Sequence, residues 1–359
     1  MEVLVLDTNF ESVTVIDSFK SLIWTDRYSV CGDFELALAM DPSLLEFLKE
    51  DYYLWFRESE HCMIIEDLAI DSDVEDGNML IVTGRSLESI LERRIVWGQK
   101  VLKGNLQNGI QTLLNEAIIS PSDTNRKISN FIFESCTDTK VTDLTIDAQY
   151  FGEDLYTIIS GLCEENSIGF KIILNDDNQF VFSLYAGADR SYDQTANPYV
   201  IFSPNFDNII NSNYFMSKAT LKNVILVAGE GEGSSRKTAT TGSGSGLDRR
   251  EFFVDARDIS SHTDDGDLSD SEYTDQLVSK GNKTLAENTV TTAFEGEVEA
   301  TQLFKYGEDF FIGDIVQIAD DYGHENAAYI SELVISQDDN GFSIHPTFKS
   351  ITETEVESE

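Results

Sequence analysis

The sequence predicts a mainly β protein of the α+β class, with two related β-units near its ends and an inserted α+β domain. Three observations predict this class. Short apolar segments with period-two alternation fill both ends of the chain, and turn dipeptides separate them. Strong helical periodicity is concentrated in the middle. The 359 residues, 41% of them hydrophobic, are enough for two or three domains.

One hairpin pattern occurs twice and indicates an internal duplication. The first copy reads IEDLAI over 65–70 and is followed by Asp76-Gly77. The second reads ISELVI over 330–335 and is followed by Asn340-Gly341. Both dipeptides favour a type I′ hairpin turn, because this turn needs positive φ at both central residues. We therefore expect two related β-units, with the middle of the chain as an insertion.

The first β-unit is expected over residues 1–96. Phe34, Leu36, Leu38 and Met40 alternate with smaller or polar residues, as in a half-buried strand. The remaining elements expected here are a helical turn over 44–48, hairpin strands over 63–70 and 79–82, and a short helix over 86–95. Ser86 is expected to cap that helix, and Arg93 and Arg94 lie in its last turn, where the helix dipole favours cations.

Residues 97–197 are expected to form the inserted α+β domain. Apolar residues at helical spacing predict helices over 106–117 and 155–162. Strands are expected over 144–148, 168–174 and 180–184, the last two joined by the turn Asp176-Asp177-Asn178. This order predicts helices packed on one face of one sheet.

The second β-unit is expected over residues 198–350. Its predicted strands span 199–202, 220–228, 248–254 and 290–300. Residues 229–246 hold six glycines and no large apolar side chain, so a flexible loop is expected there. Ser269 and Glu272 form a capping box for a helix over 269–288. Residues 351–359 are an acidic tail that we expect to fray.

The stretch Tyr306–Ile318, YGEDFFIGDIVQI, precedes the second hairpin, which spans 328–348. Gly313-Asp314 predicts a tight bend. We interpret Asp309 and Asp314 as turn and strand-edge residues, and expect Phe310, Phe311 and Ile315 in the wall of the second unit.

The net charge of −40, from 25 basic and 65 acidic residues, argues against nucleic-acid binding through phosphate neutralisation. No apolar run approaches the roughly 18 residues of a membrane span. The N-terminus has no secretory signal, so we expect synthesis in the cytoplasm.

No motif predicts catalytic, cofactor-binding or metal-binding residues. His61 and Cys62 are neighbours and would face opposite sides of a strand. Residues 264–272 miss the glycine and the final glutamate of a calcium loop, and the glycine-rich segment is not a P-loop. The 65 acids make any carboxylate pair arbitrary. The other candidates, for which we expect packing or surface roles, are His262, His324, His345, Cys31, Cys136 and Cys163.

Three stretches carry a resemblance to a known family: residues 69–97, residues 149–187 and YGEDFFIGDIVQI. With them, the whole chain resembles the baseplate-hub or tail-associated proteins of siphophage tails, which are related to the hub of contractile tails. The resemblance implies a structural, non-enzymatic virion protein at the tail tip, assembled in the host cytoplasm. It implies two tube-like β-barrel units per chain and a homotrimer that imitates a six-fold ring.

The implied partners are a distal tail protein hexamer, the tape-measure protein and a tail fibre or receptor-binding protein. DNA would pass only in transit through a channel that opens on host contact, without specific binding or stable membrane insertion. An acidic lumen would repel that DNA over roughly 8 Å. Longer relatives carry C-terminal domains for receptor binding or cell-wall hydrolysis, and this chain ends just after its second β-unit.

Two other functions stay open. A tail-associated cell-wall hydrolase would need a cleft with perturbed carboxylates or a Cys–His pair. A carbohydrate-binding module would need an exposed aromatic platform, for which Tyr185, Tyr192 and Tyr199 are candidates.

Overall fold

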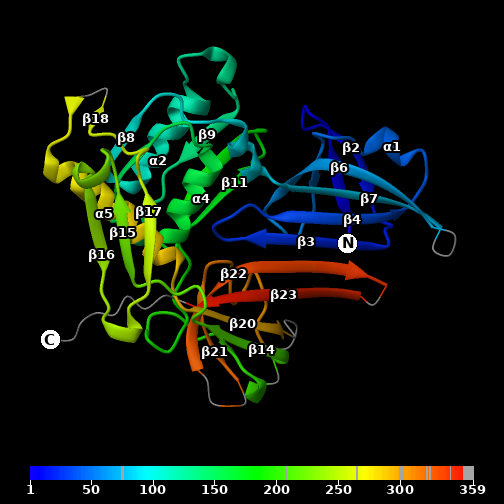
Figure 1. Cartoon of the computed structure of the whole chain (residues 1–359). Helices are drawn as coiled ribbons and strands as arrows, with labels where there is room; N and C mark the ends of the chain where they lie inside the picture. The colour runs from blue at the N-terminus through cyan, green and yellow to red at the C-terminus, as the bar shows by residue number, and fades with distance from the viewer. Residues whose placement is uncertain are drawn as a thin grey trace.

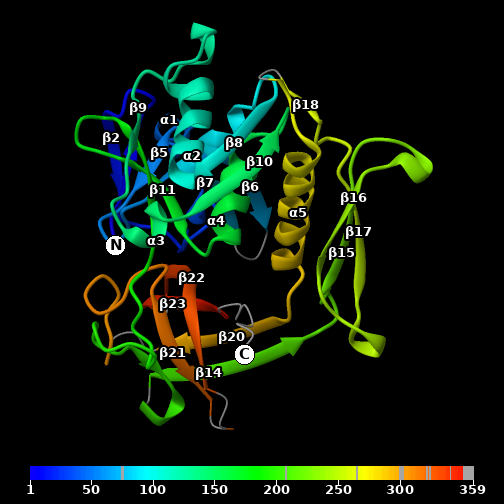
Figure 2. The same ribbon diagram turned by 90° about the vertical axis from the view of Figure 1, so that its left-hand side faces the viewer.

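The computed structural model describes residues 1–73, 77–206, 208–263, 266–298, 303–320, 322, 325–339 and 341–350. Two β-units lie one above the other, and the helical middle of the chain lies beside the upper one (Figures 1 and 2). Asp76, Asn340, His324 and the acidic tail 351–359 lie outside the described residues.

Strands from both ends of the described chain form one sheet of 13 strands. Eleven follow the order β14-β20-β23-β22-β3-β4-β7-β6-β5-β1-β2, while β21 pairs with β22 and β13 with β21. The strands are β1 Val3–Leu6, β2 Ser12–Ile16, β3 Ser21–Arg27, β4 Asp33–Ala39, β5 Tyr53–Trp55, β6 Cys62–Asp73, β7 Gly77–Ser86, β13 Ile201–Phe202, β14 Ile209–Ser217, β20 Thr291–Val298, β21 Ile315–Ala319, β22 Glu325–Asp338 and β23 Gly341–Ser350.

The two β-units are joined through this sheet and do not form separate closed barrels. Antiparallel pairing of β22 with β3 connects the second unit to the first. Within the described residues the strand path is open, with β14 at one end and β2 at the other. The expectation of two tube-like β-barrel units is therefore not confirmed, because β3 of the first unit pairs with β22 of the second and the strand path stays open.

A single apolar core lies under both units. It is formed by alternating residues such as Phe34, Leu36 and Leu38, and it continues into Phe202 and Phe348 of the second unit. Burial of apolar surface contributes about 25 cal/mol per Å² to the free energy of folding. Because residues of both units are buried in this one core, it stabilises their association.

The middle of the chain has its own core and two sheets. β8 pairs with β10, and β12 lies between β9 and β11. The predicted helices are present: α2 starts at its cap Asn105 and α4 at its cap Asp154. The elements are η1 Leu87–Arg93, β8 Lys100–Asn105, α2 Leu106–Leu114, the π-helical η2 Asn115–Ile119, η3 Thr124–Arg126, β9 Phe131–Glu134, α3 Thr139–Thr142, β10 Thr145–Tyr150, α4 Leu155–Glu165, β11 Gly169–Leu174 and β12 Phe180–Tyr185.

A third small core lies between β14 and β20 in sequence. Helix α5 (Asp270–Glu287) begins with the predicted capping box of Ser269 and Glu272, and packs on the sheet β16-β15-β17. Tyr273 and Leu277 of the helix bury Ile225 and Val227 of the sheet. The elements are β15 Val224–Ala228, η5 Gly233–Ser235, β16 Thr238–Gly242, η6 Gly246–Asp248, β17 Glu251–Asp255, β18 His262–Thr263 and β19 Gly266–Asp267.

Two expectations differ from the structure here. The segment 229–246, expected to be a flexible loop, contains β16, because its small residues Ala239 and Thr241 pack under α5 and its backbone pairs with β15. Ser86 does not cap the helix that follows it. Its hydroxyl instead accepts a hydrogen bond from the N–H of Gly32 at 2.7 Å. The short α1 (Leu44–Phe47) and η4 (Pro204–Phe206) complete the described helices.

Candidate functional site

The two hairpins that match in sequence also match in their pairing. In β6–β7 the register shifts between Ile65 and Asp67. In β22–β23 it shifts between Ile330 and Glu332, which are the same positions of the repeated sequence. A β-bulge at one alignment position in both copies confirms that the hairpins are equivalent.

The equivalence extends to the residues that precede β5 and β21. Asp51 has φ of 63° and donates its N–H to the carbonyl of Ile65 at 2.9 Å. Gly313 has φ of 87° and donates to the carbonyl of Ile330 at 2.8 Å. In each unit, a residue with positive φ therefore donates a hydrogen bond to the isoleucine at the bulge. The stretch Tyr306–Ile318 is the counterpart of the segment before β5.

Two further strands complete the repeat. Phe34 of β4 pairs with Gly84 of β7, and Phe294 of β20 pairs with Phe348 at the equivalent place in β23. Next in order, β3 pairs with β4 and β14 pairs with β20. The units therefore share the order β3-β4-β7-β6-β5 and β14-β20-β23-β22-β21, in which β14 is the counterpart of β3.

The contact between the units is made by one half of β22. Residues Glu332–Gln337 pair with Leu22–Arg27 of β3, and the guanidinium of Arg27 donates to Glu332 at 2.6 Å. The equivalent residues of β6, Asp67–Ser72, pair only with β7 within the described residues. This edge of β6 and the edge strand β14 lie at opposite ends of the joined units (Figure 1). The pairing of β22 with β3 is therefore one copy of this contact, formed inside the chain. The equivalent strands β6 and β14 are not paired with each other within the described residues.

Asp314 has a role that sequence reasoning missed. It lies in a turn directly before β21, as expected, where its N–H donates to the carbonyl of Phe311. In addition its side chain is buried and accepts hydrogen bonds from the N–H of Ala188 at 2.7 Å and the guanidinium of Arg190 at 2.6 Å. It thereby ties the segment after β12 to β21. Asp309 does lie in a turn, where it accepts from the N–H of Lys305. Phe310 is fully buried, while Phe311 is 43% exposed.

Three ionisable side chains are buried where the first β-unit meets the middle of the chain. His61 lies 3.5 Å from a carboxylate oxygen of Glu88, which also accepts from the N–H of Ile172. Asp26 accepts hydrogen bonds from Trp24 and Ser59. All three are less than 5% exposed.

Their charges are coupled. Burial lowers the pKa of His61, but the negative charges of Asp26 and Glu88 outweigh burial and raise this pKa to about 9. Burial raises the pKa of Asp26. Burial also raises the pKa of Glu88, but its interaction with His61 outweighs this and lowers the pKa. Such a cluster joins the first β-unit to the middle of the chain.

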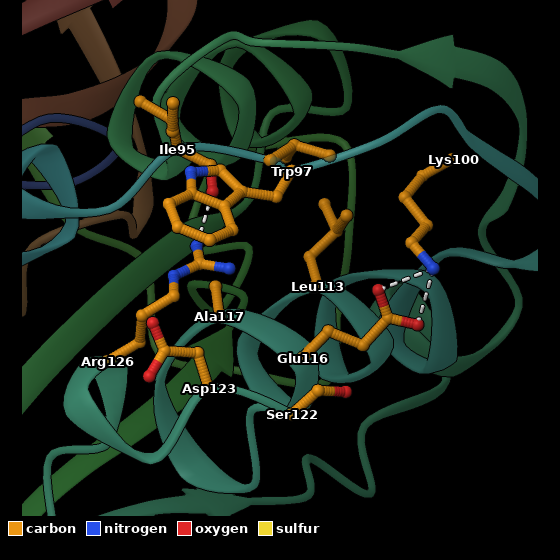
Figure 3. Close-up of a pocket in the computed structure, with 10 residues that line it drawn as sticks. Ile95, Trp97, Lys100, Leu113, Glu116, Ala117, Ser122, Asp123 and Arg126 are labelled. Carbon is orange, nitrogen blue, oxygen red and sulfur yellow. Dashed lines mark hydrogen bonds and ion pairs between the residues drawn. The ribbon is translucent and has the colours of Figure 1, made fainter.

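A surface pocket of about 390 Å³ lies where α2 continues into the π-helix (Figure 3). Trp97, 60% exposed, stands at its rim with the guanidinium of Arg126 4.6 Å from the ring centre. Arg126 also donates to the carbonyl of Ile95, and Lys100 is paired with Glu116. Arg126, Lys100 and Glu116 are thus already paired with other atoms of the protein. We therefore interpret the pocket as a junction between packed elements.

The remaining sequence candidates are dispersed. Tyr192 and Tyr199 form an exposed edge-to-face pair, but Tyr185 packs on Tyr28 instead, so the three tyrosines make no common platform. His262 contacts Asp267, and His345 contacts Ser343. Burial raises the pKa of the Cys62 thiol. No group of metal-ligating side chains, no disulfide and no helix long and apolar enough to cross a membrane occurs among the described residues.

β14 has no counterpart among the strands expected from the sequence. Its residues alternate poorly in polarity, and the neighbouring segment 203–208 gave no strand signal. A signal did exist: Phe34-Glu35 and Phe294-Glu295 hold the same positions in the two units, and the first pair is joined to β3 as the second is to β14.

The model of the Siphovirus ReqiPepy6 Gp37-like protein family matches residues 2–348, and the chain belongs to this family. No curated protein matches the sequence.

Several solved structures share the fold. The prophage tail protein gp18 from Listeria monocytogenes EGD-e is 13% identical with a TM-score of 0.57, and the alignment covers 99% of this chain and 96% of that one. The 43 kDa tail protein of prophage MuSo2 from Shewanella oneidensis is 11% identical with a TM-score of 0.60 and 98% of both chains covered. A chain of the Francisella PdpA–VgrG complex is 10% identical with a TM-score of 0.50, over 97% of this chain and 57% of that one.

Proposed function

We propose that this protein is the baseplate hub at the tail tip, where it joins the tail tube to the distal tail protein ring. The observation that carries the proposal is the duplicated unit, joined within one chain through β22 and β3. Two equivalent units per chain allow three chains to present six similar units. A homotrimer can then meet a hexameric ring without a mismatch of symmetry.

The proposed modules follow the duplication. Residues 1–96 and 198–350 supply the tube-like units, and residues 97–197 form the inserted domain beside the first of them. Closed tubes would arise only when several chains assemble, since the sheet of one chain is open. The segment 351–359 is proposed as an acidic tail.

We propose that the open face of the joined sheet lines the tail channel. Cross-strand neighbours place Asp67, Thr83 and Glu35 in one row of this face, and Asp71 lies on the same face four residues along β6. Among the described residues of this face, the cations Arg27, Arg85 and Lys349 are already paired with acids. Such a lining carries net negative charge and would repel DNA phosphates during passage.

The proposed neighbours follow from this position. The distal tail protein hexamer would contact one end of the trimer, the tape-measure protein would end in the channel, and a tail fibre or receptor-binding protein would attach outside. The protein would act by opening a channel, without enzymatic activity, and would be assembled in the host cytoplasm. The shared fold with a chain of the PdpA–VgrG complex supports a place in such assemblies.

Native mass measurement of the purified chain, alone and mixed with the distal tail protein, tests the proposal. We expect a trimer, and a complex of three chains with six copies of the distal tail protein. A chain that stays monomeric at all concentrations and does not bind that ring would contradict the hub function.

A further inference from the structure

We infer that each chain binds the next copy of itself by strand addition, with Asp67–Ser72 of β6 pairing antiparallel to Ser212–Ser217 of β14. This inference rests on the proposed hub function and specifies the interface within it. Its source is the internal junction, in which the same halves of the repeated strands already pair. The chain therefore contains a template for its own contact with a neighbour.

The template gives the register residue by residue. Inside the chain, Glu332 pairs with Arg27 and Ser336 with Ile23. The shared bulge places Asp67 and Asp71 at the positions of Glu332 and Ser336. The shared pairing of Phe34 and Phe294 places Ser217 and Asn213 at the positions of Arg27 and Ile23, so Asp67 should oppose Ser217 and Asp71 should oppose Asn213.

The exposure of equivalent side chains indicates that these two edges are covered in the assembly. Ile335 is fully buried at the internal junction, whereas its counterpart Ile70 is 51% exposed. Thr25 is 4% exposed, whereas its counterpart Phe215 is 53% exposed. An exposed apolar strand edge invites pairing with another chain, and the internal junction shows which strand fits it.

Charge complementarity favours the same partner. The edge of β6 carries Asp67 and Asp71, both exposed. At the end of β14 lie the cations Lys218 and Arg250, linked by a hydrogen bond from the Arg250 guanidinium to the Lys218 carbonyl at 3.0 Å. In the proposed register they approach Asp67 of the next copy, as Arg27 approaches Glu332 within the chain.

The proposed contact between β6 and β14 would join identical chains into a ring. The two edges are different surfaces at opposite ends of the joined units, so the contact is head-to-tail (Figure 1). Head-to-tail contacts between identical chains close into rings when the rotation allows it. Each chain would donate β14 to one neighbour and accept β14 of the other on β6.

Cysteine cross-linking tests the register. The double variant Asp71→Cys with Asn213→Cys, oxidised mildly, should migrate as a covalent trimer on a non-reducing gel. The matched variant Ser336→Cys with Ile23→Cys occupies the equivalent internal positions and should cross-link within one chain, leaving a monomer band. The offset variant Asp71→Cys with Ser217→Cys should remain uncross-linked, because four residues displace the cysteines by about 13 Å.

Native mass of each variant separates the two proposals. A trimer that yields the internal cross-link but no Asp71–Asn213 cross-link would overturn the strand pairing and leave the hub function standing. A trimer that cross-links in the offset variant would overturn the register. A protein that is monomeric by mass at every concentration would contradict the hub proposal, and the strand pairing with it.

Discussion

The two β-units share one strand order and differ in what surrounds them. In the first, β3 leads to β4 through five residues, 28–32, and its outer edge is covered by β22. In the second, the equivalent connection from β14 to β20 contains a whole module, made of the sheet β16-β15-β17, the short pair β18-β19 and α5, and β14 ends the strand order. The two units thus share one strand order, and they differ in their connecting segments and in which strand edges are paired.

The buried polar groups differ in the same way. Asp26 of β3 lies in the ionisable cluster with His61 and Glu88, whereas Met216 holds the equivalent position in β14. In the second unit the buried carboxylate is Asp314, paired with Arg190. Each unit therefore uses its own buried ion pair to attach the part of the chain that packs on it.

The largest expected effect is on the cluster of the first unit. Glu88→Ala removes the carboxylate 3.5 Å from the buried His61 and leaves the N–H of Ile172 without its acceptor, so we expect a loss of about 3–5 kcal/mol in the free energy of unfolding. Urea denaturation followed by circular dichroism measures it. Glu92→Ala, one helical turn along in a partly exposed ion pair with Arg85, is the matched control and should cost under about 1 kcal/mol. Equal losses in both variants would show that burial of the cluster is unimportant.

The second unit gives the next largest effect. Asp314→Ala removes the acceptor of Arg190 and of two backbone N–H groups, so we expect a loss of about 3 kcal/mol. Asp309→Ala, in the same stretch but exposed, should cost about 1 kcal/mol or less. Thermal unfolding of both variants makes the comparison, and a greater loss from the Asp309 variant would restore the interpretation of Asp314 as an ordinary turn residue.

The pH dependence should come mainly from the first unit. The folded-state pKa of His61 is raised to about 9 from 6.5, so its stabilisation is complete below pH 6.5 and is lost as pH rises through 9. The slope should approach about 1.4 kcal/mol per pH unit between these values. Urea midpoints from pH 6 to 9.5 measure it. In His61→Gln this slope should flatten, and an unchanged slope would assign the effect to other groups.

The smallest effect tests whether the bulges are equivalent. Ile65 and Ile330 are both fully buried. Ile65→Val and Ile330→Val should each cost about 1 kcal/mol. Because the two residues lie in different hairpins, the double variant should lose the sum within about 0.5 kcal/mol. Unequal or non-additive losses in urea denaturation would break the equivalence of the two units.

Sequence patterns predicted those elements whose formation depends on nearby residues. The capping box set the start of α5, helical periodicity set α2 and α4, and the repeated Ile-x-acid-Leu-x-Ile pattern identified both hairpins. The segment 229–246 was misjudged, because β16 is stabilised by α5, which lies about thirty residues further along. Only part of the candidate site was predicted from the sequence: both hairpins were predicted, and strand β14 was not.

The sequence by itself determined that this chain is mainly β, acidic and duplicated, since alternation, charge and repetition are local properties. Only the tertiary structure decided that the two units share one open sheet and one core. Strand pairing depends on which edges meet across hundreds of residues, and identical backbone groups give no local sign of their partner. The burial of Asp314 was decided in the same way, because an acid in a turn and an acid holding a distant linker look alike until Ala188 and Arg190 are placed beside it.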